Sequence, residues 1–388
     1  MPMFEAKQAA AITPSNASAY QEAILPKVSR TFALTIPQLP PALRDVVANA
    51  YLLCRIADTI EDEPAFSPDE KGVYEKAFVD AVMGVADARR FAAELAPRFS
   101  NATSESERDL LFQLPLVLEI TRTFNATQHA AIVDCLKVMS QGMHDFQRVV
   151  GLQGLDTLRD MDRYCYCVAG VVGEMLTRML IDFEPEMASQ RATLMHLAIS
   201  FGQGLQMTNI LKDQWEDRSH GVCWLPQDVF ARHGVKLADL HPGKQDARYA
   251  AAMIELIGVA HAHLCHAVEY TLIVPARHAG FRRFCLWSIG LAVLTLRNLQ
   301  DRLDFSSGAQ IKVSRAAVAQ TISLTRLTDK YDPAVRWLFA AAARKLPLTT
   351  LASEWDNAKV SPQVWPWRRA SYLNGMVSRR DPKDARSL

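Results

Sequence analysis

The chain has 388 residues, of which 49% are hydrophobic and 22% are charged, and this composition is typical of a globular protein. Its formal net charge of +1 gives no electrostatic basis for binding nucleic acid. The seven cysteines follow no regular spacing and form no CxxC pair, so we expect free thiols in a reducing compartment and no disulfide framework.

The N-terminal residues to Ser18 lack the apolar core of a signal peptide. The longest apolar stretch, around residues 285–296, is bounded by arginines and is shorter than a membrane span, so we expect a buried helix there. These features predict a cytoplasmic protein that could touch the inner face of a membrane peripherally.

Helical signals dominate the chain in order, because apolar residues recur at intervals of three and four among strong helix formers. The clearest helices are predicted over residues 46–60, 110–124, 128–149, 191–216, 248–272 and 281–305. Alternating strand patterns with hairpin turns are almost absent, and no boundary resembles an interdomain linker. We predict a poorly ordered segment over residues 1–20, one all-α domain over residues 21–350, and a tail over residues 351–388.

The last part of the tail, residues 365–388, is basic and begins with Trp365 and Trp367 beside Arg368 and Arg369. Tryptophan next to arginine can seat a segment at a membrane interface. A solvated tail with one packed tryptophan is the favoured interpretation, and a membrane contact is the alternative.

Two short acidic segments each carry aspartates four positions apart: Asp58 with Asp62, and Asp213 with Asp217. On an α-helix this spacing places both carboxylates on one face, one turn apart. Two such helices facing each other would gather four carboxylates, which repel one another unless cations intervene. Mg²⁺ suits such a site, because it takes a few carboxylates and leaves its other positions to water and phosphates. The two segments therefore predict an enzyme that binds a diphosphate through magnesium.

Each acidic segment continues a polar stripe on an otherwise apolar helix. Helical steps back from Asp58 reach Arg55 and Tyr51, and steps back from Asp213 reach Asn209 and Gln206. One such stripe alone would indicate an ordinary amphipathic helix facing solvent. Two matching stripes with amide and arginine neighbours favour a metal site, since those side chains suit a metal or phosphate shell.

Four motifs occur in an order that resembles a known family. They are the residues 29–32 (SRTF), 51–62, 164–173 (YCYCVAGVVG) and 208–217. Together they resemble the squalene and phytoene synthase family of head-to-head prenyl transferases, over about residues 29–315, and most nearly the bacterial squalene synthases. The resemblance implies a single-domain, all-α isoprenoid synthase bundle around a central apolar cavity.

The resemblance also implies the chemistry. Two farnesyl diphosphates would condense to presqualene diphosphate, which would then ionise and rearrange, with Mg²⁺ (or Mn²⁺) as the metal. Squalene synthases finish with a hydride from NADPH, whereas phytoene and dehydrosqualene synthases lose a proton. A monomer or weak dimer is expected.

Carried over position by position, the resemblance implies the following roles. Metal binding falls to Asp58, Asp62, Asp213 and Asp217, with Asn209 beside them; diphosphate binding falls to Arg30, Arg55, Lys212 and Gln206; catalytic roles fall to Tyr164, Tyr51, Phe32 and Arg55. Tyr164 would shuttle a proton through its phenol in the first condensation. On residue type alone, Tyr164 would be a core tyrosine with a satisfied hydroxyl.

The later segments favour squalene over a carotenoid precursor. Phe284 would lie near the cation of the second step, and Lys312 with Arg315 would help to bind NADPH, although a core phenylalanine and two surface charges are the alternatives. No glycine-rich dinucleotide fingerprint follows a strand, so NADPH would sit in the helical cavity. One departure stands out: Val222 occupies the position where the family usually has arginine, and Arg218 could substitute for it.

Three rival functions stay open at this stage. A phytoene or dehydrosqualene synthase would share the first half-reaction and omit the hydride. A terpene cyclase would use one substrate molecule. A non-catalytic helical protein would use its acidic faces only to bind cations or a partner. The choice between C15 and C20 substrates is not decided by the sequence.

Overall fold

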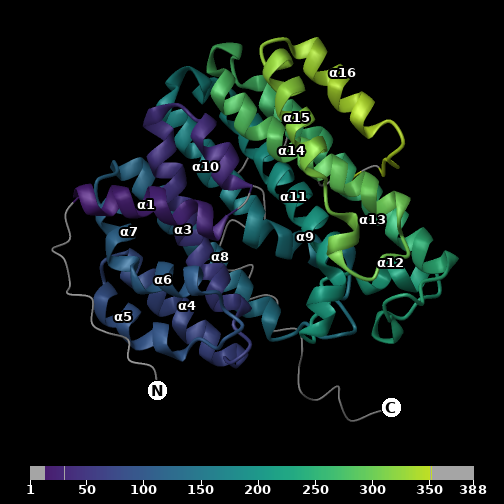
Figure 1. The fold of residues 1–388 in the computed structure, drawn as a ribbon, viewed down its shortest axis with the longest axis horizontal. Helices are drawn as coiled ribbons and strands as arrows, with labels where there is room; N and C mark the ends of the chain where they lie inside the picture. Colours follow the sequence, from purple (N-terminus) through teal and green to yellow (C-terminus); the bar gives the residue numbers. More distant parts are fainter. Residues whose placement is uncertain (1–13, 30, 350, 352–388) are drawn as a thin grey trace. The chain divides into compact units, whose positions relative to one another are not determined.

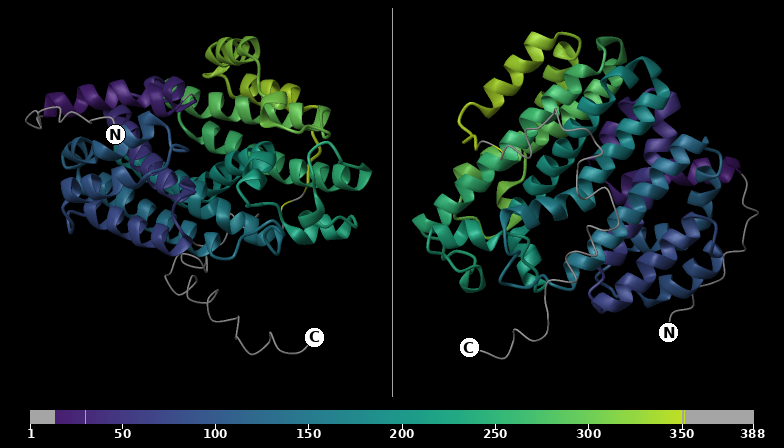
Figure 2. Two further views of the ribbon diagram at one scale, coloured as in Figure 1. Left: turned by 60° about the horizontal axis from the view of Figure 1, so that its bottom comes forward. Right: turned by 180° about the vertical axis from the view of Figure 1, so that it is seen from behind.

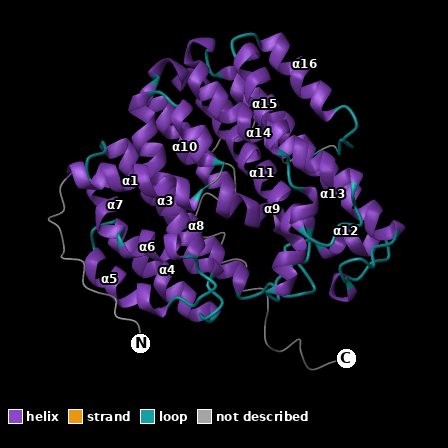
Figure 3. Ribbon diagram, viewed as in Figure 1, coloured by secondary structure: helices purple, strands orange, loops and turns teal. Residues whose placement is uncertain are grey.

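The computed structural model describes residues 14–29, 31–349 and 351 (Figure 1). In this part of the chain the regular structure is helical, with no β-strand and one isolated parallel bridge between Leu155 and Pro226 (Figure 3). The prediction of an all-α fold is therefore confirmed. The chain divides into two compact units, residues 1–140 and 141–388, where the sequence predicts one domain.

The first unit is built from helices of four to 22 residues. These are α1 (Pro14–Val28), α2 (Phe32–Thr35), α3 (Pro41–Asp62), α4 (Pro68–Val82), α5 (Ala88–Leu95), α6 (Glu105–Phe112), α7 (Leu114–Thr121) and the first part of α8 (Ala126–Gln147), with 3₁₀ turns at Ile36–Gln38 and Ala96–Arg98. Helix α1 begins at Pro14, so residues 14–20 of the segment predicted to be poorly ordered are helical.

Helix α3 carries the first acidic segment and crosses the core of its unit. Val46, Leu53 and Ile60 recur every seven residues and are almost fully buried, so one stripe of the helix packs inward. The helix ends at Asp62, because Glu63 precedes a proline and turns to an extended conformation. The Glu63 carboxylate then accepts hydrogen bonds from the Ser100 amide and the Thr103 hydroxyl, which fixes this end of α3.

The predicted helix over residues 110–124 is two helices in the structure. Helix α6 ends at Phe112 and α7 begins at Leu114, with Gln113 between them at φ −90° and ψ 15°. Pro115 stands in the first turn of α7, where its missing N–H costs nothing. The proline therefore breaks a pattern whose apolar periodicity runs on without interruption.

The second unit contains the longer helices. These are the end of α8, then α9 (Leu158–Cys165), α10 (Val171–Phe183), α11 (Arg191–Ser219), α12 (Gln227–Arg232), α13 (Ala247–Ile273), α14 (Ala279–Asp301), α15 (Arg315–Thr328) and α16 (Asp332–Ala343), with 3₁₀ turns at Pro185–Gln190, Leu237–Asp239, Ala276–His278 and Gly308–Ile311. Helices α15 and α16 pack on α14, as Figure 2 shows from two further sides.

A π-helical turn, Tyr166–Gly170, joins α9 to α10 within the motif of residues 164–173. Such turns widen a helix by one residue per turn and occur often at functional sites. Small residues bring this helix against α11: a Cβ added to Gly202 would lie 2.2 Å from the Ala169 carbonyl oxygen, and one added to Gly173 would lie 2.2 Å from that of Ala198. The backbones therefore meet where only glycine fits.

Three helical segments are long and apolar enough to cross a membrane by length and composition: Leu158–Phe183, Ala247–Ile273 and Ala276–Asp301. Their most apolar windows are 67%, 72% and 61% buried inside the protein. The apolar stretch near residues 285–296 was predicted to be too short to span a membrane. It belongs to a helical segment of 26 residues, so this prediction underestimated the length. The burial of its side chains agrees with the expected core helix.

Replacing Gly202 with alanine is expected to lower the free energy of unfolding by about 1–3 kcal/mol, because the new methyl group meets a backbone carbonyl that cannot move aside. Urea unfolding would measure the change. Gly151→Ala is the matched control, since its added Cβ meets only the flexible Gln153 side chain and should cost less than about 1 kcal/mol. Equal stability of Gly202→Ala and the wild type would contradict the described contact.

Candidate active site

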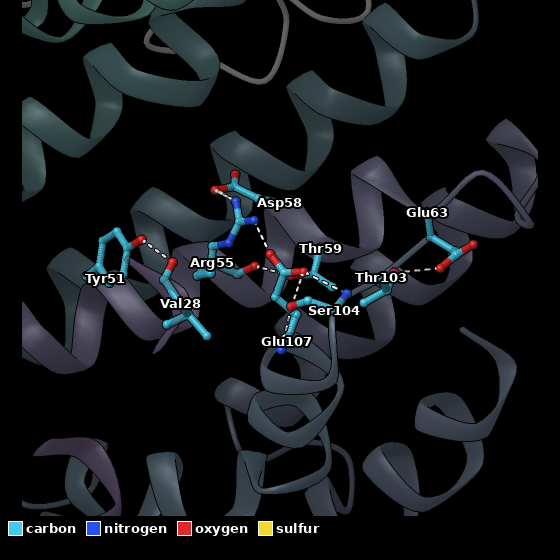
Figure 4. Close-up of polar contacts among 9 residues, drawn as sticks. All are labelled: Val28, Tyr51, Arg55, Asp58, Thr59, Glu63, Thr103, Ser104 and Glu107. Atoms are coloured by element: carbon cyan, nitrogen blue, oxygen red, sulfur yellow. Dashed lines mark hydrogen bonds and ion pairs between the residues drawn. The ribbon is translucent and has the colours of Figure 1, made fainter. Parts of the chain in front are cut away.

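The first acidic stripe lies on α3 and is ordered by an ion-pair chain (Figure 4). One guanidinium nitrogen of Arg55, Nη1, lies 3.7 Å from Asp58 Oδ2, and the other, Nη2, donates to Glu107. Glu107 is the third residue of α6 and also accepts from the backbone amide and hydroxyl of Ser104, which form a capping box. Arg55 is therefore held beside Asp58 by a carboxylate that is itself fixed.

The electrostatics of this stripe favour a cation. Burial raises the pKa of Asp58 to about 7; Arg55 opposes the rise, and the carboxylate of Asp62 adds to it. The pKa of Arg55 is raised although burial opposes this, because Asp58 and Glu107 stabilise the charged guanidinium. Asp58 thus carries its negative charge at a cost, and a divalent cation between the two aspartates would remove that cost.

Tyr51 and Phe32 lie together on the same side of the first unit. Their ring centroids are 5.0 Å apart with the planes tilted by 41°, and the Tyr51 hydroxyl donates to the Val28 carbonyl at 3.1 Å (Figure 4). The Phe32 amide donates to Ser29 Oγ, so the motif of residues 29–32 opens α2. The remaining residue of that motif, Arg30, lies outside the described residues, and its diphosphate role stays a prediction.

The second acidic stripe lies on the C-terminal half of α11. Gln206, Asn209, Asp213 and Asp217 are partly or fully exposed, whereas the intervening Met207, Ile210, Leu211 and Trp215 are buried. The structure therefore places the predicted residues on one accessible face of the helix. Their contacts with a metal or substrate stay predictions.

Asp213 pairs with its neighbour along the chain. Lys212 Nζ lies 3.0 Å from Asp213 Oδ2, and Gly308 approaches the same carboxylate closely enough that a Cβ there would lie 3.2 Å from Oδ1. Burial raises the pKa of Asp213, Lys212 opposes that rise, and Glu216 adds to it. Each acidic stripe thus combines a partly desolvated aspartate with one basic side chain.

Tyr164 lies in the second unit between two aromatic side chains. The ring of Trp224 stacks on it, with centroids 3.8 Å apart and planes 5° from parallel, and Phe146 meets it edge-on at 5.5 Å. The tyrosine is the penultimate residue of α9, two positions before the π-helical turn begins, and is only 4% exposed. Its ring orientation is therefore set by the stacked indole and the edge-on phenyl ring.

Arg218 has a structural task in this unit. Its guanidinium donates to the carbonyl oxygens of Leu152, Ala238 and Leu240 at 3.1, 3.4 and 3.1 Å. These bonds tie the segment at Leu152 and the 3₁₀ turn around Ala238 to the end of α11. The suggested diphosphate role of Arg218 stays a prediction.

The residues expected to act in the second step lie in different surroundings. Phe284 is buried on α14 and packs against Phe281 at 6.0 Å. Lys312 and Arg315 are exposed on either side of Ser314, which caps the N-terminus of α15. Two cations beside free helix N–H groups suit a phosphate, and the cofactor role stays a prediction.

The donor set fits a shared magnesium–diphosphate site better than an all-protein metal cage. Among the described residues, no group of three or more His, Cys, Asp or Glu side chains is arranged to hold a metal ion. Each stripe instead offers two aspartates one turn apart, and Mg²⁺ commonly combines one or two carboxylates with substrate phosphate oxygens. That the two acidic stripes face each other stays a prediction.

Comparisons with known proteins assign the class and then the family. The fold is that of isoprenoid synthases: a ligand complex of TcSQS matches with a TM-score of 0.69 and 24% identity over 89% of this chain and 96% of that one. A dehydrosqualene synthase structure matches with a TM-score of 0.57 and 20% identity over 81% of this chain and 96% of that one. At these identities the likeness concerns the fold.

The sequence profile described as Squalene/phytoene synthase matches residues 25–317. The chain therefore belongs to the squalene/phytoene synthase family. The squalene synthase of Eremothecium gossypii is 29% identical over 275 residues, 70% of this chain and 60% of that protein. That of Nicotiana benthamiana is 29% identical over 325 residues, 82% of this chain and 74% of that protein.

These relatives refine the predictions. The chain spans 60% of the length of the Eremothecium protein, and both named relatives are eukaryotic. These relatives do not show the predicted nearness to bacterial squalene synthases. Family members use Mg²⁺ and act on prenyl diphosphates.

Two residues of the candidate site were missed in the sequence. Glu107 orients Arg55, and its signal was the capping box that begins at Ser104, although the link to Arg55 spans 52 positions. Trp224 stacks on Tyr164 across 60 positions, and no local pattern predicts such a contact. Both contacts depend on the fold rather than on spacing along one helix.

Asp58→Asn should leave the protein folded and raise its thermal midpoint at about pH 8 by a few degrees, because it removes a charge that the folded state disfavours. The folded pKa near 7 exceeds the unfolded value, so the wild type loses stability as pH rises from about 4 to 7. The gain from Asn should therefore vanish near pH 4. Melting curves in a chelator would measure it.

The same variant should lose at least about 100-fold in turnover of prenyl diphosphate with Mg²⁺. Asp80→Asn is the control, since Asp80 pairs with Lys76 on the exposed face of α4. A variant Asp58→Asn that unfolds, or that turns over like the wild type, would show that Asp58 is a structural residue.

Proposed function

We propose that this protein is a squalene synthase, which joins two farnesyl diphosphates head to head and then reduces presqualene diphosphate to squalene with NADPH. The family match covers both acidic stripes and the motif of Tyr164. Squalene synthases of a fungus and a plant are among its relatives. The proposal extends their printed activity to this chain.

One observation carries the proposal: each of two helices, α3 and α11, presents paired aspartates one turn apart beside one basic side chain. Arg55 accompanies Asp58 at 3.7 Å, and Lys212 accompanies Asp213 at 3.0 Å. Two such sets match the two diphosphate groups that a head-to-head condensation must bind. On an ordinary amphipathic surface helix these carboxylates would be fully solvated.

In the first half-reaction the chain's own residues bind, orient and move one proton. The guanidinium of Arg55 and the ammonium of Lys212 hold diphosphate oxygens, and Asn209 with Gln206 completes the polar face of α11. Bound Mg²⁺ supplies charge neutralisation to the departing diphosphate. The Tyr164 hydroxyl relays the proton released as the cyclopropane ring closes to the departing diphosphate.

In the second half-reaction Phe284 and the predicted cofactor-binding residues act. Phe284 presents an aromatic ring to the rearranging cation and helps to exclude water. Lys312 and Arg315, at the N-terminus of α15, hold the phosphates of NADPH through charge and backbone N–H groups. We expect the enzyme to act at the cytoplasmic face of a membrane, because its product, squalene, is insoluble in water.

A dehydrosqualene or phytoene synthase is the second candidate, and one residue favours it. Val222 stands where related enzymes usually carry an arginine, so the chain has one cation fewer for the cofactor or the second diphosphate. The Arg218 guanidinium, the suggested substitute, donates to three backbone carbonyls.

Incubation of the purified protein with farnesyl or geranylgeranyl diphosphate and Mg²⁺, with and without NADPH, separates the candidates. Squalene formed only with NADPH is the expected result. A conjugated C30 or C40 hydrocarbon formed equally in both reactions would identify the second candidate. A cyclic C15 product would identify a terpene cyclase, and no turnover would refute the enzyme assignment.

Phe284→Ala should reduce squalene formation about tenfold more than formation of presqualene diphosphate, because its ring serves the later cation. Product ratios from one reaction, measured by chromatography, would show this. Phe281→Ala, which removes the neighbouring core ring on α14, controls for the loss of packing. An equal loss of both products in Phe284→Ala would remove its second-step role.

A further inference from the structure

Trp224 and Tyr164 form a close aromatic pair in the described part of the second unit. Their rings are 3.8 Å apart and 5° from parallel, so the indole covers one whole face of the phenol ring. Phe146 contacts the tyrosine edge-on at 5.5 Å with an interplanar angle of 67°. The ring is therefore restrained in both tilt and depth.

The two stacked residues belong to segments that are bonded to each other through the backbone. The Leu155 amide donates to the Leu225 carbonyl at 2.9 Å, and the Gln227 amide donates to the Leu155 carbonyl at 2.7 Å. Asp228 then accepts from the Leu158 amide at 2.9 Å, at the first turn of α9. The segment that carries Trp224 is thus fastened to the start of the helix that carries Tyr164.

Gly154 makes this pairing possible. It has φ +82°, which favours glycine, and a Cβ there would lie 2.3 Å from the Leu225 carbonyl oxygen. The two chain neighbours of Trp224, Cys223 and Leu225, are almost fully buried. The indole is consequently presented by a fixed loop and has little freedom to leave the phenol.

The same loop begins at the second acidic stripe. The Val222 amide donates to the Asp217 carbonyl at 3.1 Å, and the next residue after Asp217, Arg218, holds the loops at Leu152 and Leu240. Six residues, 218–223, therefore link a predicted metal ligand to the residue whose ring covers Tyr164. The acidic end of α11 and the phenol are parts of one connected arrangement within the second unit.

We infer that Trp224 is a positioning residue for the Tyr164 hydroxyl in the first condensation. This assignment rests on the proposed function, in which that hydroxyl moves a proton. A misplacement of about 1 Å can cost about 100-fold in rate, because proton transfer requires hydrogen-bond contact. Trp224 sets the plane in which the phenol oxygen lies, and its effect should therefore appear in kcat and depend on Tyr164.

The test compares Trp224→Leu, which cannot stack, with Trp224→Phe, which keeps an aromatic face. Formation of presqualene diphosphate without NADPH is followed at saturating and limiting substrate. Trp224→Leu should lower kcat by about 10- to 100-fold with KM within about threefold, and Trp224→Phe should recover most of the loss. Trp337→Leu is the control, because that tryptophan is 71% exposed on α16.

A double variant distinguishes positioning from general packing. In the Tyr164→Phe background, which lacks the hydroxyl, adding Trp224→Leu should change kcat by less than about twofold. A further 10-fold loss there would show that Trp224 acts independently of Tyr164 and would overturn the inference. If Trp224→Leu does not fold, Trp224→Met, whose longer and flexible side chain adapts to irregular gaps without an aromatic face, carries the same comparison.

The outcomes separate this inference from the proposed function. A wild type that forms no presqualene diphosphate overturns the proposed function and the assignment that depends on it. An active wild type with unchanged kcat in Trp224→Leu overturns the positioning role alone. A change confined to KM would assign Trp224 to substrate binding and would also overturn it.

Discussion

Two like charges held one helical turn apart are the constraint on which this structure depends. Asp58 with Asp62 on α3, and Asp213 with Asp217 on α11, keep carboxylates close together, and all of them except the exposed Asp62 are partly buried. Burial raises the pKa of both Asp58 and Asp213, so the ionised form of each carboxylate is less stable here than it would be in water. A fold tolerates such sites when a cation and its anionic partner complete them.

The surrounding structure explains how these side chains are kept in place. Arg55 is shared between Asp58 and a glutamate that a capping box fixes at the start of α6. In the second unit, close contacts at Gly173 and Gly202 lock the π-helical turn after Tyr164 against α11. The site thus consists of ordinary polar side chains on rigid helices, whose positions are set by packing and capping.

Much of this arrangement could be predicted from the sequence, because it depends on spacing within single helices. The aspartate pairs, the stripe from Gln206 to Asp217 and the small residues of the Tyr164 motif all follow from helical periodicity. Periodicity did not predict the break at Gln113, since one proline interrupts an unbroken apolar pattern. Nor did it predict the hydrogen bonds of Arg218, the suggested substitute for the arginine missing at Val222, to three backbone carbonyls.

Contacts between distant segments could not be predicted, because the spacing of residues along one sequence carries no signal for them. The stack of Trp224 on Tyr164 and the bond from Arg55 to Glu107 are of this kind. The roles of Lys312 and Arg315 also depend on a cofactor, and exposure alone does not assign one. Local chemistry was predictable, whereas the partner of each group required the fold.

The central claim is that the aspartates bind diphosphate only together with a divalent cation. Calorimetric titration of the protein with farnesyl thiodiphosphate, which resists ionisation, tests it most directly. The account predicts micromolar binding in Mg²⁺ and a loss of at least about 100-fold in a chelator. Equal affinity with and without the metal would contradict it, because the carboxylates would then repel the ligand that they are proposed to hold.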